Sequence, residues 1–180
     1  MDAGEHPRAF VSADFDSDGL NDLLIVGSGH GEKGEPNRIL MAAKAKTIRD
    51  GAYLSAEELI DSARANIGAN ADKAKGIFLR DRSHGACVAD VDGDGVLDLF
   101  ITNFEQGNRL FIGAATSAYQ KVPRFQESFD LPLLGFPNAP MAGAAKSQGC
   151  LFFDADNDGD LDLYVINGIG QPNSLYVGKH

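Results

Sequence analysis

The sequence predicts an all-β fold made of three successive repeats. A nine-residue pattern, Asp-x-Asp-x-Asp-Gly-x-x-Asp, occurs three times, with its first aspartate at Asp14, Asp90 and Asp154. A short run of aliphatic, β-branched and aromatic residues follows each copy at once and stops at Gly or Asn, as buried strands do. The chain is 43% hydrophobic, which is enough for a packed core and excludes a disordered protein. We therefore expect one globular domain.

Each acidic loop is predicted to hold a cation. At least four carboxylates crowd into nine residues and repel one another, so the loop is stable only around a positive charge. Ca²⁺ takes hard oxygen ligands, here the carboxylates of positions one, three, five and nine and the backbone carbonyl of position seven, and the glycine at position six allows the sharp turn. The three predicted Ca²⁺ sites consist of Asp14, Asp16, Asp18, Leu20 and Asp22; of Asp90, Asp92, Asp94, Val96 and Asp98; and of Asp154, Asp156, Asp158, Asp160 and Asp162.

The EF-hand is the competing interpretation of these loops. An EF-hand loop starts in the same way but needs a glutamate at position twelve and a helix on each side. Position twelve is Ile25, Ile101 and Val165 in the three copies, and none of these side chains can bind a metal. Each motif is therefore predicted to be a strand-loop-strand corner with the cation in the bend.

The loop, the strand after it and a trailing Asn-Arg/Ser-Leu-Phe/Tyr element resemble the FG-GAP (VCBS) repeats of integrin-α-type β-propellers. The second and third copies are most similar to the bacterial and cartilage-acidic-protein branch of that family, in which the loop continues Leu-Tyr-Val and is followed by Asn-x-Leu-Phe/Tyr. The resemblance covers nearly the whole chain except about residues 44–76. It implies four-stranded blades of a propeller, with each loop joining the innermost strand of a blade to the second.

The first repeat is expected over residues 8–82. Residues 76–80 are the preferred candidate for its fourth strand, and residues 52–54 compete for that place. A capping box that starts at Ser55, followed by apolar residues at helical spacing, predicts one inserted amphipathic helix at about residues 55–67. The first three strands are expected at residues 9–13, 23–26 and 37–41.

The second repeat, residues 83–130, is expected to form a complete blade, and the third, residues 147–178, a blade without its fourth strand. Strands are expected at residues 85–89, 99–102, 108–112 and 124–129, and at 149–153, 163–166 and 173–177. The fold class is thus all-β, with three FG-GAP-like blades of a partial propeller and one inserted helix. Closed propellers need about four to eight blades, so apolar blade faces should remain open. We expect self-association through them, around residues 175–177 and the 130–148 connection.

The two cysteines allow two interpretations. Cys87 lies three residues before its loop and Cys150 four residues before its own. We expect them to be two small buried hydrophobic residues, and a disulfide between adjacent repeats is the alternative, because sequence alone does not give the geometry.

Net charge and composition limit which partners the chain can bind and where it can be located. The formal charge is −10, and the loops hold half of the 26 acidic residues, so three bound Ca²⁺ would leave −4. No basic stripe is present to bind nucleic acid, and no apolar run is long enough to span a membrane. No signal peptide is recognisable, yet loops of this kind suit millimolar extracellular calcium. We expect an extracellular, cell-surface or periplasmic location as part of an exported parent.

Two functions follow from the resemblance. The first is a non-catalytic calcium-binding module, a rigid platform for adhesion to a protein or glycan ligand. The second is a calcium-dependent carbohydrate-active enzyme, a lyase or hydrolase. Each loop uses its carboxylates on its own ion and leaves no free acid and base together, which argues against catalytic residues. We therefore expect a non-enzymatic module.

Overall fold

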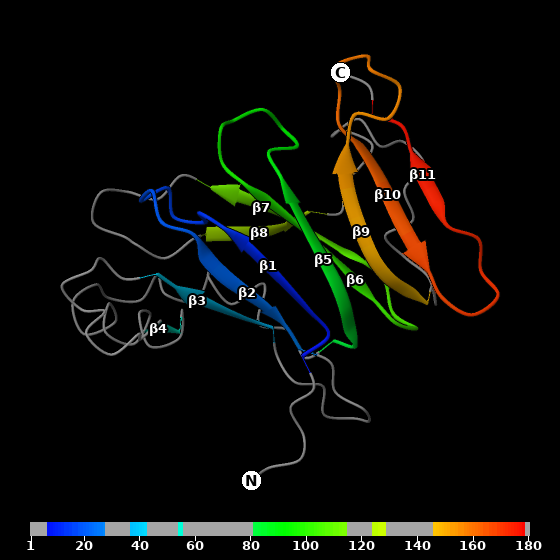
Figure 1. Ribbon diagram of the computed structural model, residues 1–180, viewed down its shortest axis with the longest axis horizontal. Coiled ribbons are helices and arrows are strands. Elements are labelled where there is room, and N and C mark those ends of the chain that lie inside the picture. The colour runs from blue at the N-terminus through cyan, green and yellow to red at the C-terminus, as the bar shows by residue number, and fades with distance from the viewer. Residues whose placement is uncertain are drawn as a thin grey trace, which may run out of the picture.

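The computed structural model describes residues 7–27, 37–42, 54–55, 81–114, 124–128 and 146–178. This part of the chain contains eleven strands in three antiparallel sheets and no helix, which confirms the all-β class (Figure 1). No helix that is long and apolar enough to cross a membrane occurs in it. In each sheet, strands that follow one another in the sequence are also hydrogen-bonded neighbours.

The strands of the three sheets lie close to their predicted positions. The first sheet contains β1 (Ala9–Ala13), β2 (Asp22–Val26), β3 (Arg38–Met41) and β4 (Leu54–Ser55). The second contains β5 (Ser83–Ala89), β6 (Asp98–Asn103), β7 (Arg109–Ala114) and β8 (Arg124–Ser128). The third contains β9 (Ser147–Phe153), β10 (Asp162–Asn167) and β11 (Ser174–Tyr176).

The fourth strand of the first sheet differs from the preferred prediction. β4, at Leu54–Ser55, pairs with β3 through Leu40 and Met41, so the competing segment takes this place. The preferred candidate, residues 76–80, lies outside the described residues. The predicted helix does too, apart from Ser55, which belongs to β4.

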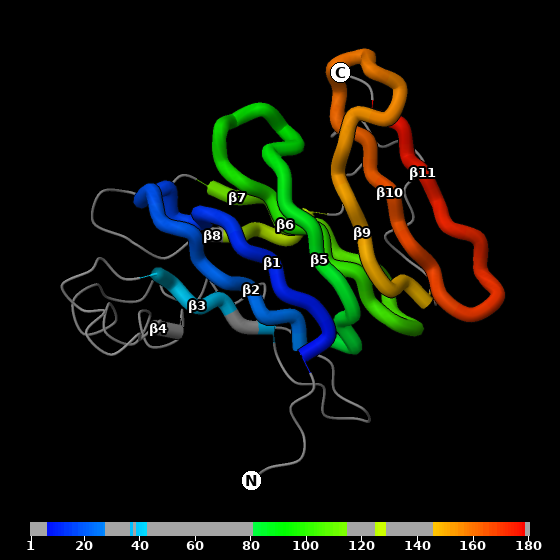
Figure 2. Tube along the Cα trace, viewed as in Figure 1, coloured from blue at the N-terminus to red at the C-terminus, as the bar shows by residue number. Residues whose placement is uncertain are grey.

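The first strands of the three sheets lie side by side. β1 contacts β5, and β5 contacts β9, as the tube in Figure 2 also shows. Successive side chains of a strand point to opposite faces of its sheet, so the middle sheet can contribute to two cores. Leu99 and Ile101 pack with the first sheet, whereas Phe100 packs with the third. β6 is accordingly buried along its whole length, as expected for a strand covered on both faces.

Cys87 and Cys150 form a disulfide, which corrects the expectation of two unbonded cysteines. The bond joins β5 to β9, where the two Cα atoms are 5.7 Å apart. The backbones of these strands approach closely, because a Cβ atom on Gly85 would lie 2.8 Å from the carbonyl oxygen of Gln148. The second and third sheets are therefore covalently linked.

Candidate metal centre

The three acidic loops occupy equivalent corners of the three sheets. Each connects the first strand of its sheet to the second, β1 to β2, β5 to β6 and β9 to β10. The strand pairing closes the loop, because the aspartate at position nine is the register partner of the residue just before position one. These pairs are Ala13 with Asp22, Ala89 with Asp98 and Phe153 with Asp162.

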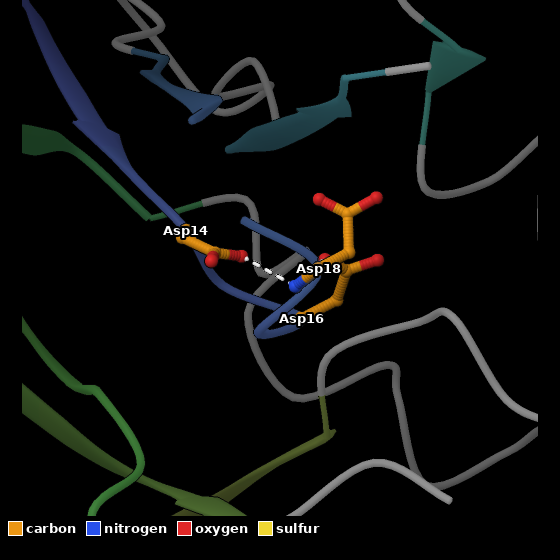
Figure 3. A group of neighbouring side chains, drawn as sticks. All are labelled: Asp14, Asp16 and Asp18. Carbon is orange, nitrogen blue, oxygen red and sulfur yellow. Dashed lines mark hydrogen bonds between the residues drawn. The ribbon is translucent and has the colours of Figure 1, made fainter. Parts of the chain in front are cut away.

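The structure brings three carboxylates together in each loop. Figure 3 shows the first group, Asp14, Asp16 and Asp18. The second group is Asp90, Asp92 and Asp94, and the third is Asp154, Asp156 and Asp162. Within each group one oxygen from every residue lies within 4.8 Å of the others. Ligands at opposite sides of one Ca²⁺ are about 5 Å apart, since each Ca–O distance is about 2.3–2.6 Å. Each group therefore fits around one ion.

Backbone amides shape each loop around its carboxylates. Asp90 Oδ2 accepts a hydrogen bond from the amide of Gly95 at 2.8 Å, and Asp92 Oδ1 accepts one from Asp94 at 3.2 Å. The amide of position seven donates to the position-five carboxylate in all three loops, from Leu20, Val96 and Asp160 at 2.9, 2.8 and 3.0 Å. These bonds direct the carboxylates of positions one, three and five to the inside of the turn.

Position four of each loop is a conformational requirement that the sequence analysis missed. Ser17, Gly93 and Asn157 have φ angles of 58°, 75° and 62°, in the left-handed region. Only the glycines at position six were expected there, and their φ angles lie between 85° and 95°. Glycine and asparagine tolerate the left-handed region better than most residues. Their occurrence at position four was therefore a usable signal.

The aspartate at position nine connects the loop to the third strand. Asp98 is fully buried, and its Oδ2 accepts a hydrogen bond from the amide of Val91 at 2.7 Å, while Oδ1 accepts one from Gly113 at 2.8 Å. Asp22 and Asp162 bind the corresponding two amides in their own sheets. The carboxylate groups gathered in the first two loops do not include Asp22 or Asp98. The third group in turn leaves out Asp158 and Asp160. Metal coordination stays a prediction for every residue of the three loops.

The electrostatics of the loops suit a bound cation. Burial, and then the neighbouring charges of Asp18 and Asp22, raise the pKa of Asp16 from 3.8 to about 6. Burial also raises the pKa of Asp98 to about 6, with Asp92 and Asp90 adding to the effect. Asp90 Oδ1 is buried and has no hydrogen-bond partner. A hard divalent cation would satisfy this oxygen and neutralise the carboxylates around it.

These pKa values predict how stability depends on pH when calcium is removed. Between pH 4 and 6 the folded chain holds protons on Asp16 and Asp98 that the unfolded chain has lost, so stability falls as pH rises through this range. We expect the thermal midpoint in EDTA to decrease between pH 4.5 and 7. With excess Ca²⁺ the carboxylates bind metal in place of protons, and this decrease should disappear.

Asp16→Asn is the matched variant for this measurement, because it removes one carboxyl group with a raised pKa and keeps its shape. Its midpoint in EDTA should vary less with pH than that of the unmodified chain. A metal-free chain that gains stability between pH 4.5 and 7 would contradict the expectation.

Comparison with known proteins identifies one repeat family. Residues 90–165 match the model of the FG-GAP-like repeat. The match begins at the first aspartate of the second loop, includes the whole third loop and ends within β10. It confirms the resemblance to FG-GAP repeats for this part of the chain. The search of curated proteins found no match.

Proposed function

We propose, from the premise that residues 90–165 carry an FG-GAP-like repeat, that the chain is a calcium-binding β-propeller module. It would act as a rigid platform for binding a protein or glycan, as in adhesion. Repeats of this family are typically structural modules without enzymatic activity.

The observation that carries this proposal is that a cluster of three aspartates recurs in all three loops, at positions one, three and five in the first two and at positions one, three and nine in the third. Three corners, in three sheets, each gather three aspartates within the span of a single Ca²⁺ coordination shell. One acidic cluster is common on a protein surface, whereas three loops with the same hydrogen bonds and a left-handed backbone at the same two positions, four and six, indicate a common ligand. An ion in each bend would fix the first two strands of its sheet.

The disulfide supports an exported protein. Disulfides persist in oxidising compartments and are rare in the cytosol. Extracellular calcium is also abundant enough to fill sites of modest affinity, with dissociation constants of about 10⁻⁴–10⁻³ M. Both points favour the extracellular, cell-surface or periplasmic location.

Calorimetric titration of metal-stripped protein tests the proposal. We expect about three equivalents of Ca²⁺ to bind, one for each loop. Mg²⁺ should substitute poorly, because it requires octahedral geometry at about 2.0–2.1 Å and gives up water reluctantly. Asp156→Ala is a suitable control, since it removes both side-chain oxygens of an exposed residue that belongs to only one group. It should reduce the stoichiometry to about two, and a value of zero or one for the unmodified chain would refute the proposal.

The described residues favour the platform over the calcium-dependent lyase or hydrolase. In every loop the carboxylates of positions one, three and five accept hydrogen bonds from amides of the same loop, which suits a structural ion. A glycan array probed with Ca²⁺ and again with EDTA would identify a carbohydrate ligand. Cleavage of an array glycan in the presence of Ca²⁺ would support the enzyme instead.

A further inference from the structure

Among the described residues, the two contacts between neighbouring sheets are built in the same way. We call the face of a sheet that packs on the following sheet its trailing face, and the face that receives the preceding sheet its leading face. Leu24 and Ile39 on the trailing face of the first sheet share a core with Leu99 and Ile101 on the leading face of the second. At the next contact, the equivalent trailing residues pack against equivalent leading residues. The core there includes Phe100 and Leu110 from the second sheet and Leu163 and Val165 from the third.

Two successive side-chain hydrogen bonds, which we call the polar latch, accompany each contact between sheets. Asn108, just before β7, donates from Nδ2 to Ser147 Oγ at the start of β9 (3.1 Å), and Ser147 Oγ donates to Asn167 Oδ1 at the end of β10 (2.9 Å). The first contact has the same latch, from Asn37 to Ser83 at 3.3 Å and from Ser83 to Asn103 at 2.9 Å. The asparagine therefore belongs to the preceding sheet, and the serine with its supporting asparagine belongs to the following one.

The third sheet also has the asparagine that acts as the donor of the polar latch. Asn173, just before β11, is equivalent to Asn37 and Asn108, but its Nδ2 donates to Tyr164 Oη at 2.9 Å. The trailing face around it is apolar and exposed, with Leu151 at 54% and Leu175 at 47%. The equivalent residues of the second sheet, Cys87 and Leu110, are 8% and 0% exposed under the third sheet. In the part of the chain that the structure describes, no strand packs on this face, which lies at one end of the row of sheets (Figure 1).

We propose that the trailing face of the third sheet is a docking surface for a further sheet of the same repeat type, which it selects through a serine hydroxyl. By the register of the two existing contacts, the incoming sheet carries serine seven residues before its first loop aspartate, where Ser83 and Ser147 stand. It carries asparagine thirteen residues after that aspartate, where Asn103 and Asn167 stand. The proposal depends on these contacts and not on the calcium role.

The sequence predicts self-association around residues 175–177, but in the structure a second copy of this chain is a poorer occupant of this face, because its first sheet lacks the receiving half of the latch. The position of the serine is Pro7, which has no hydroxyl, and the position of the supporting asparagine is Gly27. Phe10, which is 60% exposed, stands where the leading faces of the other sheets have Ala86 and Cys150. A bulky ring at this position would meet Leu151 across the contact.

The test gives the first sheet of the 180-residue chain the receiving half of the latch, and we call this variant the receiver. The receiver carries Pro7→Ser, Phe10→Ala and Gly27→Asn, and Leu175→Asp blocks its own trailing face. Mixed with the unmodified chain in Ca²⁺, it should form a one-to-one complex in sedimentation experiments. We expect it to bind at least tenfold more tightly than a control with Leu175→Asp alone. Asn173→Ala in the unmodified partner should weaken the complex by about tenfold, as loss of one buried hydrogen bond does.

A cross-link gives a second readout that does not depend on affinity. Cys87 and Cys150 already pair across the second contact, so the equivalent positions in the new contact should also pair. With Leu151→Cys in the donor, and with Phe10→Cys instead of Phe10→Ala in the receiver, oxidation should yield a disulfide-linked heterodimer. Three outcomes would overturn the proposed selection. The first is equal binding of the receiver and the control, and the second is the absence of both complex and cross-link in folded chains. The third is tight self-association of the unmodified chain.

Discussion

Removal of calcium should lower the thermal midpoint of this chain by about 10 °C or more. At a concentration 10 to 100 times the dissociation constant, each bound ion contributes about 1.4–2.7 kcal/mol to the free energy of unfolding. Three ions then contribute several kcal/mol, and each kcal/mol shifts the midpoint of a domain of this size by about 2–4 °C. Thermal unfolding followed by circular dichroism in Ca²⁺ and in EDTA measures the difference.

Asp94→Ala should remove about a third of the calcium effect or more. It takes one ligand from the second loop and leaves the other carboxylates of that loop to repel one another. The second sheet packs against both of its neighbours, so we expect this loop to matter more than the first or the third. Asp18→Ala and Asp158→Ala are the matched variants. If the midpoint of the unmodified chain were the same in EDTA as in Ca²⁺, a structural role for the metal would be contradicted.

Asp98→Ala should destabilise the fold whether or not calcium is present. It leaves the buried amides of Val91 and Gly113 without their acceptor, and each such loss costs about 1–3 kcal/mol. Burial of the Asp98 charge, which also raises its pKa to about 6, offsets part of this loss in EDTA. We expect a net decrease of about 2 kcal/mol in the free energy of unfolding without calcium, and a larger one with it.

The comparison of Asp98→Ala with Asp94→Ala separates the two roles of the loop aspartates. Asp94 is exposed, so the effect of its substitution should nearly vanish in EDTA, whereas that of Asp98→Ala should persist. Asp98→Asn keeps one carbonyl oxygen as an acceptor and should fall between Asp98→Ala and the unmodified chain. Denaturant unfolding of all three variants with and without calcium is the measurement. Equal loss from Asp94→Ala and Asp98→Ala in EDTA would show that position nine has no separate structural role.

The features that the sequence by itself determined are local ones. Charge repulsion, glycine at position six and the apolar runs after each loop act over a few residues, and they were enough to predict the loops, the flanking strands and the all-β class. The absence of a ligand at position twelve was enough to exclude an EF-hand, because coordination geometry is also local.

Only the tertiary structure decided which distant segments meet. The cysteines are an example: offsets of three and four residues from their loops place Cys87 and Cys150 on opposite faces of equivalent strands. Because consecutive sheets stack trailing face on leading face, these opposite faces meet and the disulfide forms. The amides that bind Asp98, the serine that receives Asn108 and the place of β4 likewise depend on contacts between segments far apart in the chain, which no local pattern specifies.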